Sequence, residues 1–164
     1  LREEVGAGEG KIDNGLLLDL LGLSELDLAG AEIPGRAGIG IPQQAGQIKF
    51  IPRKRHPVAK RFEYSRFIAD LIQVQDAPQW LTSTDLSTSR QKFQRAFAAE
   101  FLCPFDQLTD FLKGDYSESG IEDAAAHFDV SERTVESMLA NKGVIPSPWM
   151  SDYVQLRAPY PLGV

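Results

Sequence analysis

Histidine and cysteine, the residues that most often carry metal and nucleophilic chemistry, are scarce in this sequence. The single cysteine, Cys103, excludes an internal disulfide framework and fits a reducing compartment. The two histidines, His56 and His127, have no second ligand-type residue at a spacing typical of metal sites. We therefore expect a packed thiol at Cys103, two histidines that bind no metal, and no Cys–His nucleophile.

A long apolar run and a signal segment are missing as well. The longest apolar stretch, GLLLDLLGL, is interrupted by Asp19 and is far too short to cross a bilayer. No basic-then-apolar segment opens the chain, and its first residue is Leu1 rather than methionine, which indicates a fragment or a processed form. We expect a cytoplasmic protein with no membrane partner.

What the sequence does contain is typical of one globular domain with an uneven charge. Its 164 residues are 43% hydrophobic and 24% charged, enough to bury a sizeable core. The net charge is −6, yet residues 49–66 hold seven basic residues against one acid, and residues 106–136 hold nine acids against two basic residues. Such segments either solvate the protein or steer an anionic partner to one face. The candidate binding surface is basic and consists of Arg53, Lys54, Arg55, Lys60, Arg61 and Arg66.

Local patterns predict a mainly helical α+β protein with a small sheet. Helices are expected over residues 14–22, 57–73, about 87–101, and 105–114. The segment QIKFIP alternates apolar and polar residues and predicts a strand that ends at Pro52. The segment IPGRAGIGIPQQAG is typical of loops and short edge strands. Apolar spacing predicts the buried faces of the two central helices, Val58, Phe62, Ala69 and Ile72 on the first and Phe93, Ala96, Phe97 and Phe101 on the second.

Residues 119–145 predict two short helices joined by a tight turn, in the manner of a helix-turn-helix. Ser131 is expected to cap the second helix. The inner faces are expected to be formed by Ile121, Ala124 and Ala125 on the first helix and Val135, Met138 and Leu139 on the second, with Phe128 and Val130 filling the turn between them. The second helix would present Glu132 and Glu136 to phosphates of the same sign, so packing within the domain is favoured over DNA recognition.

The order of these segments resembles that of the ImmA/IrrE family of zinc-dependent endopeptidases. In that family a strand precedes a helix reading R-F-T-x-A-H-E-x-G-H, a second helix carries a glutamate ligand before F-A-A-x-L-L-x-P, and a helical pair follows. Here the counterparts are QIKFIP, RFEYSRFIAD, FAAEFLCP and IEDAAAHFDVS, over about residues 46–145. The resemblance implies a zincin-type helical core over residues 46–113, within a domain spanning 12–145 that ends in the helical pair. Residues 1–11 are expected to be disordered, and 146–164 form a tail rich in proline and aromatic residues.

The zinc ligands that the resemblance implies are missing. The positions of the two histidines hold Arg66 and Asp70, the position of the catalytic glutamate holds Phe67, and Phe93 stands where the third ligand is expected. In H-E-x-x-H the histidines at i and i+4 share one helix face and bind one Zn²⁺, while the glutamate takes a proton from its water. A guanidinium has no lone pair to offer a metal. We expect Arg66 and Asp70 to form an ion pair in the former site, with Phe67 and Phe93 filling the space beside it.

These observations lead to a non-catalytic ImmA/IrrE-like domain, without zinc or another cofactor, that binds a protein partner. The resemblance implies bacterial helix-turn-helix repressors of stress responses and mobile elements as partners, which active members cleave. Two alternatives stay open. One is an active metallo-endopeptidase with an unconventional site. The other is a regulator that binds DNA through residues 119–145.

Overall fold

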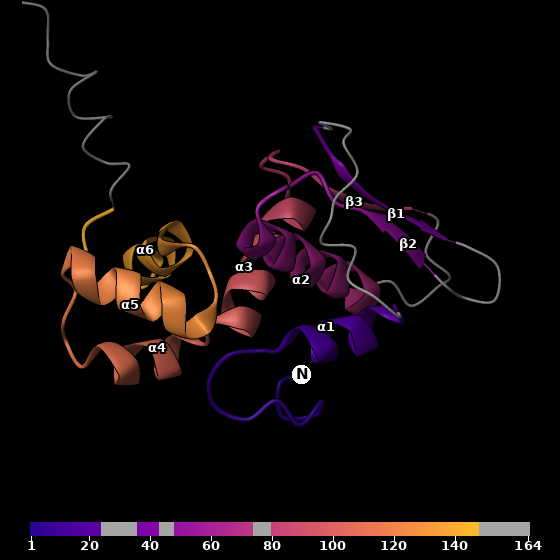
Figure 1. Cartoon of the computed structure of the whole chain (residues 1–164). Helices are drawn as coiled ribbons and strands as arrows, with labels where there is room; N and C mark the ends of the chain where they lie inside the picture. Colours follow the sequence, from indigo (N-terminus) through magenta and orange to yellow (C-terminus); the bar gives the residue numbers. More distant parts are fainter. Residues whose placement is uncertain (24–35, 43–47, 74–79, 148–164) are drawn as a thin grey trace, which may run out of the picture.

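Helices dominate the structure, a computed structural model that describes residues 1–23, 36–42, 48–73 and 80–147. The predicted mainly helical α+β class is confirmed. Figure 1 shows the sheet at one end of the molecule, α4, α5 and α6 at the other, and α1, α2 and α3 between them. The elements are α1 (Asn14–Leu21), β1 (Gly38–Pro42), β2 (Ile48–Ile51), α2 (Pro57–Gln73), β3 (Leu81–Ser83), α3 (Ser89–Leu102), α4 (Phe105–Leu112), α5 (Glu118–Phe128) and α6 (Glu132–Asn141).

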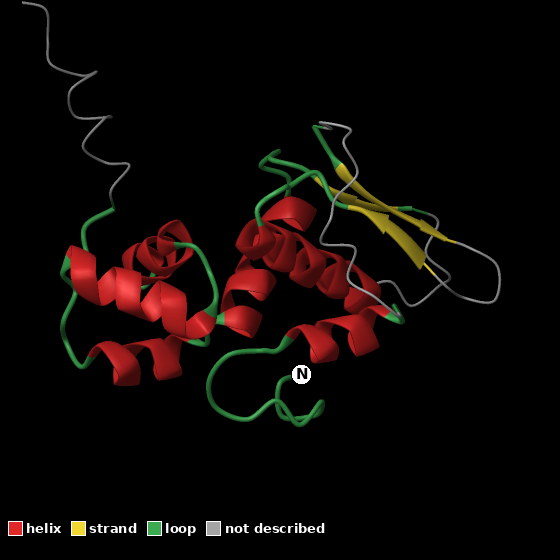
Figure 2. Cartoon of the chain, viewed as in Figure 1, coloured by secondary structure: helices red, strands yellow, loops and turns green. Residues whose placement is uncertain are grey.

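The three strands form an antiparallel sheet in the order β2-β1-β3, which Figure 2 shows beside the helices. The glycine-rich segment was expected to give edge strands, but β1 is the central strand. Two glycines explain its place. A Cβ atom at Gly40 would lie 3.0 Å from both Leu81 and Phe50, and one at Gly38 would lie 2.7 Å from Glu63 Oε1. Side chains at these positions would push the neighbouring strands and α2 away from β1.

Helix α2 has the predicted bounds but is buried on more than the predicted face. It lies against the sheet through Tyr64 and Phe67, and the Phe67 ring centroid is 4.8 Å from that of Phe50. Of the predicted face Ala69 is buried, whereas Ile72 is 51% exposed. The helix contacts α1, α3 and β3 along its middle, so its polar residues are buried as well. Apolar periodicity describes a helix with one buried face and therefore failed here.

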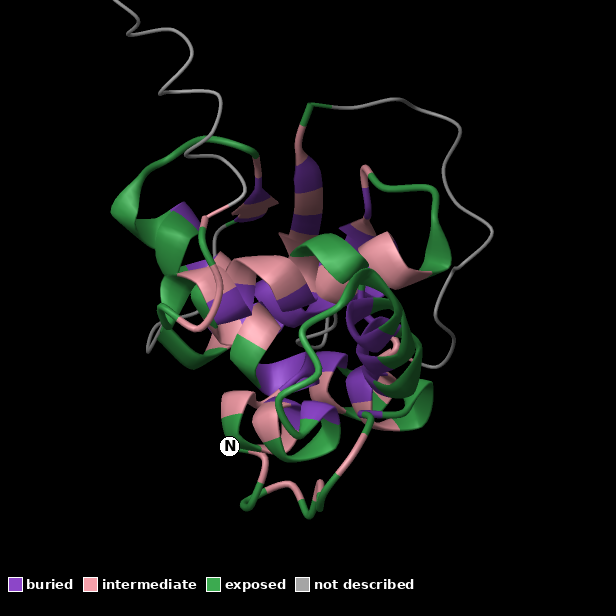
Figure 3. Cartoon of the chain, turned by 90° about the vertical axis from the view of Figure 1, so that its left-hand side faces the viewer, coloured by how far each residue is buried: buried purple, intermediate pink, exposed green. Residues whose placement is uncertain are grey.

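Helix α3 turns a polar face inward, contrary to the aromatic face that its sequence predicts. Its buried residues are Gln91, Gln94, Ala98, Phe101 and Leu102. The aromatic residues instead stack on one another along the helix, with ring centroids 6.3 Å apart for Phe93–Phe97 and 5.5 Å apart for Phe97–Phe101. Of the predicted face, only Phe101 lies in the core. Figure 3 shows the buried middle of the molecule between exposed outer surfaces.

The N-terminal residues pack on the domain. Arg2 Nη1 donates to Phe101 O at 2.6 Å, and Gly10 N donates to Gln107 Oε1 at 2.8 Å. Helix α1 is capped by the side chain of Asp13, and Gly22 ends it in the left-handed conformation.

The helical pair forms as predicted. Helices α5 and α6 and their turn bury all eight residues of the predicted inner faces and turn, and the Ser131 side chain caps α6 by accepting from Thr134 N. Between them Asp129 adopts φ +53°, a left-handed conformation that aspartate tolerates better than most residues. Within the described ranges, every helix is too short or too polar to serve as a membrane span. The tail beyond residue 147 lies outside the described residues.

Candidate functional site

A buried polar cluster joins α2 to α3 beside strand β3. Helix α2 contributes Glu63, Arg66 and Asp70, which share one face because they stand three and four residues apart. Helix α3 contributes Gln91 and Gln94 at a three-residue spacing, also on one face. We refer to these five residues as the α2–α3 polar cluster. Every member is at most 4% exposed.

Arg66 is at the centre of the cluster, and among the described residues it donates no hydrogen bond to a carboxylate. Its Nη2 atom donates to Gln91 Oε1, to Gln94 Oε1 at 3.1 Å and to Thr84 O at 2.7 Å. All three acceptors are neutral. Its Nε atom is buried, and it has no hydrogen-bond partner in the part of the chain that the structure describes. Burial, reinforced by the charges of Arg53 and Arg95, lowers the pKa of Arg66 to about 10, so the side chain stays protonated at neutral pH.

The two glutamines also close the outer edge of strand β3. Gln91 Nε2 and Gln94 Nε2 both donate to Thr82 O, at 3.2 and 3.0 Å. Gln91 Oε1 further accepts from Thr84 N at 2.8 Å. Each amide therefore directs its oxygen to Arg66 and its nitrogen to the strand, and these contacts fix the amide orientations. The free backbone groups of an edge strand are in this way satisfied by side chains.

Asp70 does not pair with Arg66, and the expectation of an Arg66–Asp70 ion pair is wrong. Asp70 is 1% exposed and accepts two hydrogen bonds from Arg90, at 2.9 Å from Nε and 2.7 Å from Nη2. Arg90 holds Asp70 in a bidentate pair from the first turn of α3, and this raises the pKa of Arg90. An arginine on the neighbouring helix reaches the carboxylate in a geometry that Arg66, four residues away on the same helix, does not adopt.

Glu63 anchors the loop after β2, a role that sequence reasoning missed. Its carboxylate accepts from Arg53 N at 2.7 Å, from Arg53 Nε at 3.0 Å and from Ser83 Oγ at 2.9 Å. Arg53 also donates to both carboxylate oxygens of Asp85, from Nη1 at 2.5 Å and from Nη2 at 2.6 Å. These hydrogen bonds lower the pKa of Asp85 to about 2. The signal in the sequence was that Glu63 is the sole acid within the basic run.

Of the two remaining predicted metal-site positions, one is buried and the other is exposed. Phe67 is fully buried and packs against Phe50 of the sheet. Phe93 is 39% exposed and stacks on Phe97, so it does not fill the site. The residues of α3 that face Arg66 are Gln91 and Gln94. Phe93 therefore lies on a different face of α3 from the residues that contact Arg66.

The six basic residues proposed as a binding surface do not share one exposed face. Lys54 and Arg55 are exposed, whereas Lys60, Arg61 and Arg66 are at most 3% exposed. The Arg53 side chain is 6% exposed and is paired with carboxylates. Most of these basic side chains are thus buried, and a buried charged group needs a hydrogen-bond partner.

Arg61 connects three parts of the chain. Its Nη1 donates to Asn14 Oδ1 and its Nη2 to Ile12 O, both before or at the start of α1. Its Nε lies 3.2 Å from Asp129 Oδ2, within ion-pair distance but outside hydrogen-bond geometry. Burial lowers the pKa of Arg61, partly offset by the charge of Asp129. The residue is therefore a structural link between the N-terminal segment, α2 and the turn of the helical pair.

The cluster does not fit the zinc ion that the resemblance implies. Arg66 offers no lone pair, both oxygens of Asp70 accept from Arg90, and Gln91 Oε1 is engaged by Arg66 and Thr84. Zinc prefers histidine, cysteine and carboxylate ligands. Among the described residues, no three such side chains gather as metal ligands.

The other residues considered from the sequence lie outside the cluster. Cys103 is fully buried, and burial raises the pKa of its thiol to about 12, so it is a packed thiol as expected. The His127 ring stacks on Phe111, with centroids 4.4 Å apart, beside the turn of the helical pair. His56 is exposed.

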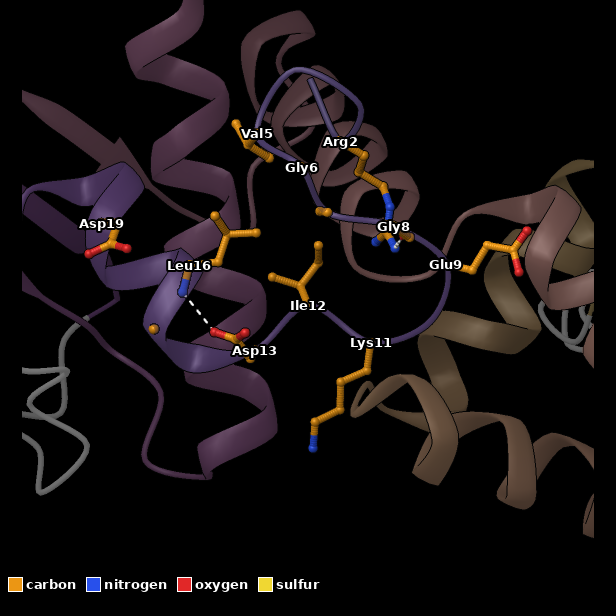
Figure 4. A pocket seen from close by; sticks show the side chains of 12 residues that line it. Arg2, Val5, Gly6, Gly8, Glu9, Lys11, Ile12, Asp13, Leu16 and Asp19 are labelled. Carbon is orange, nitrogen blue, oxygen red and sulfur yellow. Dashed lines mark hydrogen bonds between the residues drawn. The ribbon is translucent and has the colours of Figure 1, made fainter.

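A separate hollow of about 440 Å³ lies against the N-terminal segment and is lined by residues between 2 and 19. Figure 4 shows Val5, Ile12 and Leu16 on its walls and Arg2 directed toward Gly8. Arg2 Nη2 donates there to Gly8 O and Gly10 O, at 2.8 and 2.7 Å. The guanidinium thus serves to hold the loop together. The hollow contains no residue of the α2–α3 polar cluster.

Comparison of the chain with protein-family models, with curated proteins and with solved structures gives no match.

Proposed function

We propose that this chain is a non-catalytic domain with the layout of an ImmA/IrrE-type peptidase, and that it acts by binding a protein partner. The observation that supports this proposal is the α2–α3 polar cluster. The positions that the resemblance assigns to histidine ligands hold Arg66 and Asp70, and each is hydrogen-bonded to α3. These contacts join the two helices that a shared metal ion would otherwise join. The position of the catalytic glutamate is Phe67, which is buried in the core.

The chemistry of the cluster does not support hydrolysis. A metallopeptidase needs a metal-bound water and a carboxylate that can take its proton. Both carboxylates of the cluster are engaged, Glu63 with Arg53 and Ser83 and Asp70 with Arg90. No observation favours the alternatives of an unconventional peptidase site or of DNA binding. Helix α6 begins with Glu132, a charge that disfavours phosphate at a helix N-terminus.

The layout can be tested by restoring metal ligands. The combined variant Arg66→His, Asp70→His and Gln91→Glu should bind about one zinc ion per chain, since three ligands of these types complete a catalytic-type site. The wild-type protein, purified without chelator, should contain no stoichiometric zinc. Elemental analysis of the purified proteins measures both.

A matched control uses the other candidate position on α3. The variant Arg66→His, Asp70→His and Phe93→Glu carries the same ligand types, but Phe93 lies on the outward face of α3. It should not bind zinc stoichiometrically. Equal zinc in the two triple variants, or none in either folded protein, would contradict the peptidase-like layout. Stoichiometric zinc in the wild type that is lost on Asp70→Ala would defeat the non-catalytic proposal.

The binding role requires a separate measurement. The full-length protein should be co-purified from its native cells and its companions identified by mass spectrometry. An intact transcription regulator of the repressor type is the expected companion. Recovery of the same regulator as cleaved fragments that depend on this protein would instead indicate a peptidase.

A further inference from the structure

Around the α2–α3 polar cluster, arginines outnumber carboxylates by four to three. Four arginines, Arg53, Arg66, Arg90 and Arg95, gather around Glu63, Asp70 and Asp85. Arg53 pairs with Glu63 and Asp85, and Arg90 pairs with Asp70. Among the described residues, the remaining arginines donate only to neutral acceptors.

Arg66 is a buried arginine with unused donors. It is 3% exposed, and its three hydrogen bonds all start from Nη2. Among the described residues, the buried Nε atom has no hydrogen-bond partner and Nη1 donates to no acceptor. Glu63 and Asp85 act on Arg66 through their charge, but none of its hydrogen bonds reaches a carboxylate. A buried donor without an acceptor is rare in folded proteins, and an anion would supply the acceptor.

The N-terminus of α3 lies at the same place. Gln91, in the first turns of this 14-residue helix, contacts the Arg66 guanidinium, and the first turn contains no acidic residue. The positive end of a helix dipole favours a negative group there. The segment just before the helix, Asp85 to Thr88, is exposed, and Thr84 O at its start accepts from Arg66. The guanidinium therefore lies next to an exposed loop.

We propose that Arg66 and the N-terminus of α3 bind a carboxylate, with the unused Nε and Nη1 donors as its hydrogen-bond partners. Guanidinium and carboxylate match in planarity and in donor and acceptor spacing. The carboxylate comes from one of two sources, a small carboxylic acid or an acidic residue of the bound protein. The second source rests on the proposed function, in which this domain binds a protein partner.

The first test measures thermal unfolding at constant ionic strength while acetate replaces chloride. The wild-type midpoint should rise by a few degrees and reach a plateau, because a ligand of the folded state stabilises by mass action. The rise should disappear in Arg66→Gln and persist in Arg55→Gln, which removes an exposed positive charge from the same basic run. No plateau in the wild type, or the same rise in both variants, would overturn the proposal.

A second measurement covers the case in which Arg66→Gln does not fold. In ¹⁵N-labelled wild-type protein, the arginine Nε–H resonances are followed during the acetate titration. One buried Nε–H resonance should shift with saturation. Shifts confined to exposed arginines would overturn the proposal.

The source of the carboxylate is identified with two short peptides that differ only in Glu against Gln residues. Tighter binding of the Glu peptide, lost in Arg66→Gln, assigns the site to a protein partner. Acetate binding without a preference between the peptides assigns it to a small acid. If neither acetate nor the Glu peptide binds through Arg66, the carboxylate site is rejected. The proposed function would still stand, because co-purification tests it independently.

Discussion

Asp85 shows how a surface residue can depend on a buried one. Its side chain is 75% exposed, yet both of its oxygens accept from Arg53, whose side chain is 6% exposed and is held in turn by Glu63. The pKa of Asp85 is lowered to about 2, first by its hydrogen bonds to Arg53. An exposed ion pair usually contributes little, but here the arginine is already ordered by its buried partner.

This pairing predicts a specific pH dependence. A carboxyl group with a lowered pKa in the folded state stabilises the protein above its ordinary pKa, near 4, and loses that contribution as the pH falls toward 2. Asp85→Asn should therefore reduce the fall of the unfolding midpoint between about pH 4 and pH 2. The effect should be below about 1 kcal/mol because water screens this exposed group.

The control for this prediction is Glu122→Gln, at an exposed position on α5. Thermal unfolding of the three proteins is compared from pH 7 to pH 2 at fixed ionic strength. An Asp85→Asn curve parallel to the wild-type curve over the acidic range would show that the Arg53 contact does not shift the titration.

At the scale of elements, the close contact of β1 with α2 sets the position of the polar cluster. Glu63 approaches the backbone at Gly38, and Gly40 lies between Phe50 and Leu81. Strand β1 can occupy the centre of the sheet because these positions have no side chain. The approach also brings Glu63 within reach of Ser83 on β3.

Gly38→Ala tests this contact. The new Cβ would lie 2.7 Å from Glu63 Oε1, so the carboxylate or the strand must move. We expect the free energy of unfolding to fall by about 1–3 kcal/mol, the range for overpacking a filled site. Urea unfolding measures the change. Gly8→Ala, where no atom lies within 4 Å of the added Cβ and φ is not in the left-handed region, should have little effect. Equal effects of the two substitutions would argue against the contact.

The elements themselves were largely predictable, whereas their buried faces were not. The bounds of α2 and the capping of α6 follow from local signals, Pro57 at the start of one and Ser131 before the other. The buried faces depend on what surrounds each helix. Gln91 and Gln94 point inward because Arg66 and the edge of β3 need acceptors and donors, and no apolar period encodes that need.

The residues of the candidate site were predictable only in part, and their contacts were not. Sequence reasoning selected Arg66, Phe67, Asp70 and Phe93. The structure joins Arg66 and Asp70 to α3 through residues that were not selected, namely Gln91, Gln94 and Arg90. The expected Arg66–Asp70 pair failed because Arg90, on the neighbouring helix, provides a better partner. A sequence shows which charges are present, but the pairing depends on how two helices cross.

At the scale of the whole molecule, the ion pairs of Asp129 link the helical pair to the rest of the domain. Asp129, in the turn between α5 and α6, lies 3.2 Å from Arg61 Nε and 3.7 Å from Lys11 Nζ. Arg61 is buried and also holds Ile12 and Asn14. The orientation of α5 and α6 relative to α2 therefore depends in part on the charge of Asp129.

Asp129→Asn isolates this contribution because asparagine also tolerates the left-handed conformation and has nearly the same shape. We expect the free energy of unfolding to fall by about 1–2 kcal/mol, less than for a fully buried pair because Asp129 is 30% exposed. Amide hydrogen exchange should show α5 and α6 opening more readily than α2, because the variant weakens a contact between them rather than within them. Lys11→Gln removes the more exposed and more distant partner and should leave this exchange pattern unchanged. Uniform acceleration of exchange in all helices of Asp129→Asn would mean that the ion pair stabilises the fold as a whole and does not specifically hold the helical pair in place.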